Sequence, residues 1–277
     1  MLADRDVDLQ PRSQPVASTM TFLDALPTLL LLALALGLIY QLHHRLSGLI
    51  SSLVQLAGGN INTVALVLFI FFLPGIIVHE LSHFLMARLL GLRAGRFRVW
   101  PEVHRDGIGL GSVSVEQTDS LRSSLVGAAP LITGTALLTI LGLYVLRADE
   151  VVELLAYGDW SALASAFWGA LQGPDGLAAI YAMFAIGNMM MPSRSDRQAW
   201  RSPLLFLAMV TVFYIVVGLP ADPFMALLNW VTPLFAILNL ALFFVVIVDI
   251  ILAIPLWLLV AWLSQRPPQA APPPRKR

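Results

Sequence analysis

Six runs of apolar residues, separated by short polar segments, dominate the pattern along the chain. Runs of this kind are typical of helices that cross the hydrocarbon core of a bilayer, which needs about 20 apolar residues. The pattern therefore predicts an all-α multi-pass membrane protein with about six transmembrane helices. The six runs cover residues 22–42, 61–90, 124–145, 177–191, 203–219 and 233–263.

Polar segments at both ends of the chain bound this region. Residues 1–20 carry three aspartates among prolines and serines, and residues 266–277 are rich in proline and arginine. Both compositions are typical of disordered tails. We expect a single membrane domain over residues 21–265.

One linker has the alternating pattern of β-strands. Residues 96–100 and 111–116 alternate between apolar and polar side chains, and Arg105, Asp106 and Gly107 between them favour a turn. We expect a small β-hairpin element within residues 94–118. Residues 151–171, with Trp160, Phe167 and Trp168, and residues 222–231 are expected to form helices at the membrane surface.

The composition agrees with a membrane protein. Hydrophobic residues make up 58% of the chain, charged residues only 12%, and the mean hydropathy is +0.79. Soluble domains carry about 25% charged residues. The formal net charge is +0, so a nucleic-acid partner is not expected. The absence of cysteine excludes disulfides, thiolate metal sites and cysteine nucleophiles.

The placement of charges predicts a topology. Arginines gather in segments 93–122 and 194–201 and in the C-terminal tail, whereas segment 147–176 holds one arginine and five acids. By the positive-inside rule, the basic segments face the cytoplasm. We expect both termini in the cytoplasm and the protein in the bilayer of a bacterial cytoplasmic membrane.

The sharpest local pattern is His79-Glu80-Leu81-Ser82-His83, an H-E-x-x-H sequence on a predicted helix. Residues four apart lie on one helix face, so both imidazoles can bind one zinc ion (Zn2+). Glu80 then stands where it can take a proton from the water on the metal. Three ionisable groups at the end of an apolar span are unfavourable unless they are paired or functional.

A catalytic zinc site needs a third protein ligand. The remaining histidines, His43, His44 and His104, fall in predicted loops, and few carboxylates lie near the spans. Asp196 follows the fourth apolar run and is expected at the same depth as the histidine pair. The competing interpretation is a loop aspartate paired with Arg194 or Arg197, which would be worth little.

The segment from Pro74 to Gly91 around the histidine pair resembles the motif helix of the site-2 protease family, which are intramembrane zinc metalloproteases. The resemblance continues at 127–131 and at 188–196, where an asparagine precedes an aspartate by eight residues. It implies a protease-like core over about residues 61–200 that cleaves a membrane-protein substrate helix. It also implies that His79, His83 and Asp196 are the metal ligands, that Glu80 is the catalytic base, and that Asn188 holds the substrate backbone or its oxyanion.

Two other functions remain open. Arg197 follows Asp196 where the family has glycine, and this departure fits a catalytically degenerate scaffold that binds membrane partners. A zinc or proton-coupled transporter could use the same groups together with Asp249, but no inverted repeat is visible. For Asp249, deep in the last apolar run, we expect a structural hydrogen bond rather than a gating role.

Overall fold

The computed structural model describes residues 22–104, 107–147, 151, 154, 161–162, 165, 168–169, 172–173 and 175–265. The two predicted tails lie outside the described residues, as do Trp160 and Phe167 of the expected surface helix and the turn residues Arg105 and Asp106.

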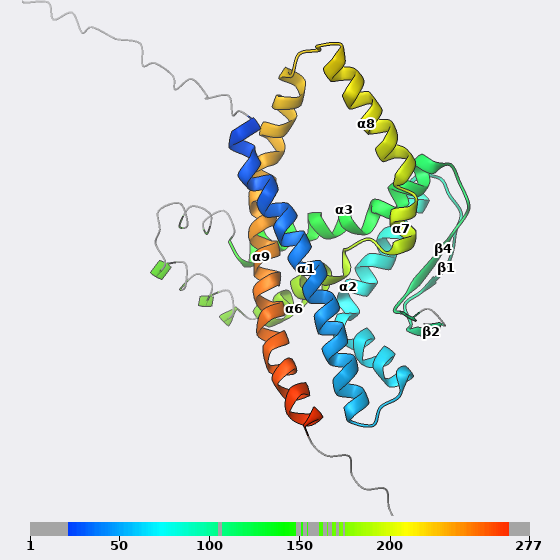
Figure 1. Ribbon diagram of the computed structural model, residues 1–277, viewed down its shortest axis with the longest axis vertical. Coiled ribbons are helices and arrows are strands. Elements are labelled where there is room, and N and C mark those ends of the chain that lie inside the picture. Colours follow the sequence, from blue (N-terminus) through cyan, green and yellow to red (C-terminus); the bar gives the residue numbers. More distant parts are fainter. Residues whose placement is uncertain are drawn as a thin grey trace, which may run out of the picture.

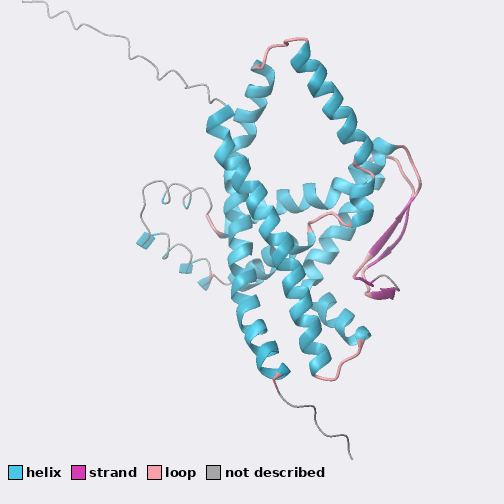
Figure 2. Cartoon of the chain, viewed as in Figure 1, coloured by secondary structure: helices cyan, strands magenta, loops and turns pink. Residues whose placement is uncertain are grey.

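Helices make up most of the described chain, and the strands lie at one edge of it (Figure 2). Within the described residues, four helices are long and apolar enough to cross a membrane, which supports an integral membrane protein. These are α1 (Phe22–Leu56), α2 (Ile61–Leu89), α3 (Ser120–Val145) and α9 (Asp222–Ser264). The shorter helices with described bounds are α6 (Gly176–Met189), α7 (Arg194–Gln198) and α8 (Arg201–Val216).

The prediction of six spans is met only in part. The fourth and fifth apolar runs form α6, of 14 residues, and α8, of 16 residues. At about 1.5 Å of rise per residue, both helices are shorter than a hydrocarbon core of about 30 Å. The helix α6 buries part of its apolar surface inside the molecule, whereas α8 buries none of its residues, and composition alone does not distinguish such short helices from spans.

Two helix boundaries differ from the sequence prediction. His43 and His44 were expected in a loop, but α1 continues through them to Leu56. Segment 222–231 was expected as a separate surface helix, but it is the first part of α9, which continues for 43 residues. A pair of polar residues or an internal proline does not end a helix whose neighbours supply packing.

The expected β-hairpin is present, as two short antiparallel pairs in succession. β1 (Ala94–Arg98) pairs with β4 (Ser112–Val115), and β2 (Glu102–His104) pairs with β3 (Gly107–Gly109). The two pairs are separated at Pro101, which has no N–H for a ladder bond.

The helix α1 lies along α9, and both run in the same direction (Figure 1). Asn239 of α9 donates to the carbonyl of Thr28 near the start of α1, at 2.9 Å. The helix α2 runs in the opposite direction to α9, so its last turns lie beside α7, well away from the end of α9 (Figure 1). That both of these ends lie on the cytoplasmic side stays a prediction of the charge pattern.

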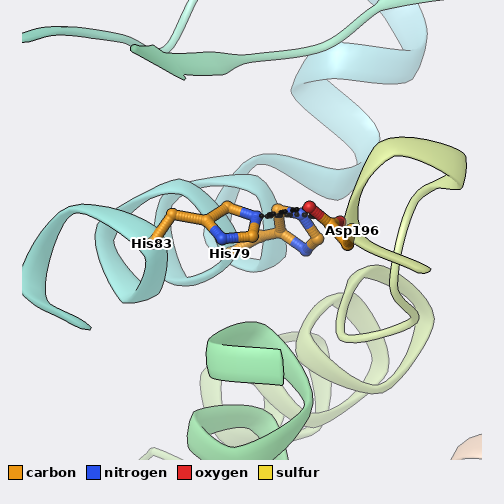
Figure 3. A group of neighbouring side chains, drawn as sticks. All are labelled: His79, His83 and Asp196. Atoms are coloured by element: carbon orange, nitrogen blue, oxygen red, sulfur yellow. Dashed lines mark hydrogen bonds and ion pairs between the residues drawn. The ribbon is translucent and has the colours of Figure 1, made fainter. Parts of the chain in front are cut away.

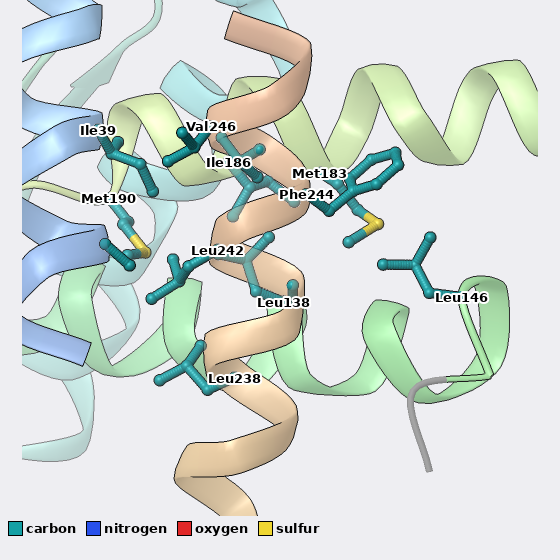
Figure 4. Packing of buried hydrophobic residues seen from close by; sticks show 13 residues of the cluster. Ile39, Leu138, Leu146, Met183, Ile186, Met190, Leu238, Leu242, Phe244 and Val246 are labelled. Atoms are coloured by element: carbon teal, nitrogen blue, oxygen red, sulfur yellow. The ribbon is translucent and has the colours of Figure 1, made fainter. Parts of the chain in front are cut away.

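The main apolar core lies where α1, α3, α6 and α9 meet (Figure 4). Ile39, Leu138, Ile186 and Leu242 bring one buried side chain from each of these helices. The core therefore fixes α6 in the middle of the bundle. This matters for function because the chain leaving α6 leads directly to Asp196.

The helices α2 and α6 approach closely at Gly75, because a Cβ atom there would collide with the carbonyl of Ala185. Beside it, Pro74 has no N–H to donate to the carbonyl of Ile70, four residues earlier. The hydroxyl of Tyr181 from α6 donates to that carbonyl at 2.8 Å. A proline that would weaken an isolated helix thus creates an acceptor for its neighbour.

Asp119 caps the N-terminus of α3. Its carboxylate accepts hydrogen bonds from the backbone N–H groups of Leu121 and Arg122, at 3.1 and 3.0 Å. The bond from the Arg122 N–H is the main reason that the pKa of this exposed carboxyl lies below its ordinary value, and the bond from the Leu121 N–H acts in the same direction. The cap fixes the start of the helix that carries Gly127 and Pro130.

Candidate metal centre

The two histidines of the H-E-x-x-H sequence lie one turn apart on α2, and each donates from Nδ1 to a backbone carbonyl. His79 contacts the Met189 oxygen at 2.7 Å, and His83 contacts the Val126 oxygen at 2.9 Å. A carbonyl can only accept, so Nδ1 carries the proton in both rings. Both Nε2 atoms therefore keep a lone pair, as a metal ligand requires.

Both carbonyls are available because the helices around them release these groups. Met189 is the last residue of α6, where helix carbonyls lack partners from their own helix. Val126 lies four residues before Pro130 of α3, which has no N–H to donate back to it. A helix end and a proline thus supply the two acceptors that orient the histidine rings.

Asp196 approaches the two histidines from α7. Its Oδ1 lies 3.5 Å from Nε2 of His83, and its Oδ2 lies 3.9 Å from Nε2 of His79. A capping box holds the carboxylate: Oδ2 accepts from the Ser193 N–H at 2.8 Å, and the Ser193 hydroxyl accepts from the Asp196 N–H at 3.2 Å. Among the described side chains, the ion contacts of Asp196 are to histidines rather than to Arg197.

The three side chains converge on one point (Figure 3). One ligand atom from each of His79, His83 and Asp196 lies within 4.8 Å of the others. The two Nε2 atoms are 3.2 Å apart. Ligands about 2.05 Å from a tetrahedral zinc ion stand about 3.3 Å apart. The distances of 3.2 and 3.5 Å fit this geometry, and the 3.9 Å between His79 and Asp196 is longer. Two lone pairs and a carboxylate facing one another repel unless a cation lies between them. The residues present therefore fit zinc.

Close backbone packing places α7 against α3. A Cβ atom on Gly127 would stand 2.7 Å from the Asp196 carbonyl oxygen and 3.2 Å from its Cα. Nearby, the Ser124 hydroxyl lies 2.5 Å from the Ala199 carbonyl oxygen. Only glycine allows the backbone of Asp196 to come this close to α3.

A cavity of about 710 Å³ adjoins the three side chains, and Glu80 lies in its wall. Glu80 is only 9% exposed. Gly111, just before β4, packs on it, because a Cβ atom there would stand 2.9 Å from Oε1. The cavity wall comes from α2, β4, α3 and α7, with the segments beside them. Glu80 thus faces the same space as the candidate ligands.

Asn188 does not reach this cavity. Its side-chain amide donates to the carbonyl of Phe184 at 3.0 Å and to Oδ1 of Asp249 at 2.8 Å. The prediction that Asp249 makes a structural hydrogen bond is confirmed, and its partner is Asn188 on another helix. The sequence offers no signal for this pair, which is 61 residues apart.

Comparison of the chain with protein-family models, with curated proteins and with solved structures finds no match. The interpretation of the site therefore rests on the residues of this chain and their geometry.

Proposed function

We propose that this protein is an intramembrane zinc metalloprotease, similar to the site-2 protease family, that hydrolyses a peptide bond in or near a transmembrane segment of a substrate protein. The observation that carries the proposal is the convergence of His79, His83 and Asp196 beside the buried Glu80 on one cavity. A ligand set with an adjacent carboxylate suits metal-assisted hydrolysis.

Each residue has a distinct part in this reaction. Zinc held by His79, His83 and Asp196 would supply a Lewis acid and an acidified water at neutral pH. Glu80 takes one proton from the water while the oxygen of that water attacks the scissile carbonyl carbon. Glu80 then delivers that proton to the leaving nitrogen as the C–N bond breaks. The Met189 and Val126 carbonyls hold the imidazole rings throughout.

The strand β4 supports an extended substrate in this cavity. Ser112, Val113 and Val115 of β4 line the cavity wall, and in the described sheet β4 pairs only with β1. A helical substrate hides its carbonyls in hydrogen bonds and must unwind before cleavage. We propose that the unwound segment adds to the second edge of β4, as peptides do at other sheet edges.

Successive N–H groups of a strand point to opposite edges, so the addition of the substrate to the second edge of β4 can be tested. Val113→Pro and Ser114→Pro each remove one N–H, and only one of the two faces away from β1. The variant that spares the hairpin should lose cleavage and keep zinc. If that variant cleaves at the wild-type rate, the substrate does not add to this edge of β4.

The function is tested with detergent-purified protein. Zinc per chain is measured first, in the wild type, His79→Ala and Asp196→Ala, and we expect about one zinc in the wild type and a loss in both variants. Cleavage of single-span peptides that carry a Gly-Pro helix break is then followed by mass spectrometry. Glu80→Gln should keep zinc and lose cleavage.

Glu102→Gln is the matched control, because this exposed glutamate pairs with Arg98 on the hairpin surface. It should keep both zinc and cleavage. A wild type without zinc would overturn the metal site. Zinc binding with cleavage that does not respond to Glu80→Gln would overturn the protease and favour the scaffold function.

A further inference from the structure

A carboxyl group is buried in the apolar core outside the candidate metal site. Asp249 of α9 is 0% exposed, and its neighbours along the helix, Val245 and Val246, are buried apolar residues. Its partner Asn188, at the end of α6, is 2% exposed. Polar groups at such positions are unfavourable in a membrane protein unless they serve a structure or a function.

The pair lies next to the acceptor of His79. Asn188 donates to Asp249 at 2.8 Å and to Phe184 of its own helix at 3.0 Å, so both of its N–H groups are used. These bonds tie the last turn of α6 to α9. The next residue is Met189, whose carbonyl accepts from Nδ1 of His79 at 2.7 Å.

We propose that Asp249 is a positioning residue for His79. Through Asn188 it fixes the end of α6, so that the Met189 carbonyl holds the His79 ring with Nε2 directed at Asp196. The hydrogen-bond chain itself stands on the structure, and only its consequence for zinc rests on the proposed function. Groups that orient metal-binding histidines in this way change metal affinity about 10- to 100-fold when they are altered.

The hydrogen bond between Asn188 and Asp249 indicates what position 249 must provide. Asn188 contributes the N–H and Asp249 contributes the acceptor, Oδ1, at 2.8 Å. An asparagine at 249 has the same shape as aspartate and keeps an oxygen that can accept from Asn188. A leucine at 249 removes the acceptor. If Asp249 positions His79, the His79 ring in Asp249→Asn should be oriented as in the wild type, and in Asp249→Leu it should not.

The test follows the His79 ring in zinc-free protein by ¹⁵N NMR of histidine-labelled samples in detergent, with His79→Gln to assign the signal. The wild type and Asp249→Asn should show the Nδ1–H form, and Asp249→Leu should show exchange between the two tautomers. If Asp249→Leu does not fold, Asn188→Ala breaks the same link and should give the same change. Leu228→Ala, which removes a buried apolar side chain from the first part of α9, away from the core around α6, should lower the melting temperature and leave the His79 signal unchanged.

Zinc affinity is then measured by competition with a chelator. Asp249→Leu should bind zinc about 10- to 100-fold more weakly than the wild type, and Asp249→Asn should bind within a few-fold of it. An unchanged His79 signal in Asp249→Leu overturns the proposal, as does an Asp249→Asn variant that resembles Asp249→Leu. If the wild type binds no zinc, the proposed function fails, while the NMR comparison still decides the role of Asp249.

Discussion

Replacing Gly127 by alanine should weaken zinc binding by moving Asp196. The new Cβ atom would stand 2.7 Å from the Asp196 carbonyl oxygen, whereas ordinary contact begins at 3.4 Å. The difference, 3.4 − 2.7, requires a shift of 0.7 Å. The opposing atoms belong to the backbone, so a side-chain rotation cannot relieve the overlap.

This shift exceeds the tolerance of a zinc site, where ligand distances hold within about 0.2 Å. We expect the zinc affinity to fall about 10- to 100-fold, the range for changes that disturb ligand orientation. That range corresponds to about 1.4–2.8 kcal/mol. The measurement is competition with a fluorescent chelator in detergent, with melting temperatures recorded on the same samples.

Gly37→Ala is the matched control, because a Cβ atom at Gly37 on α1 meets nothing within 4 Å. Alanine in a helix is favoured over glycine by about 0.5–1 kcal/mol, so neither substitution should unfold its helix through propensity alone. The control should bind zinc as the wild type does. Wild-type affinity in Gly127→Ala would refute the conclusion that contact between α3 and α7 places Asp196.

Three further predictions concern other parts of the molecule. Tyr181→Phe should lower the free energy of unfolding by about 1 kcal/mol, measured by thermal denaturation, because the Ile70 carbonyl loses its donor. Asp119→Ala should lower the melting temperature at neutral pH. Folding lowers the pKa of Asp119, so the stabilisation from this carboxylate is complete above its unfolded pKa and disappears as pH falls through its folded pKa. The difference in melting temperature between the wild type and Asp119→Ala should therefore shrink in acid. Single cysteines can be introduced at Arg93 and Ser264, because the chain has no cysteine of its own. Since α2 and α9 run in opposite directions (Figure 1), an impermeant maleimide should reach the two cysteines from opposite sides of the membrane. Labelling of both from one side would instead support the topology that the charges predict.

Local patterns in the sequence determined the parts of this structure that depend on neighbours along the chain. The apolar runs predicted the long helices, and the alternating residues of 94–118 predicted the hairpin. The four-residue spacing of His79 and His83 placed both rings on one helix face, because that spacing follows from helix geometry. The predicted approach of Asp196 to these histidines is also what the structure shows.

The tertiary structure alone decided how these elements meet. Whether α6 and α8 cross the bilayer, and in which direction α9 runs beside α1, depends on packing between segments far apart in the chain. The acceptors of the two histidines, Met189 and Val126, come from other helices and are backbone atoms, which every sequence contains. The link between Asn188 and Asp249 is likewise invisible in the sequence, because a hydrogen bond across 61 residues exists only after α6 and α9 have packed together.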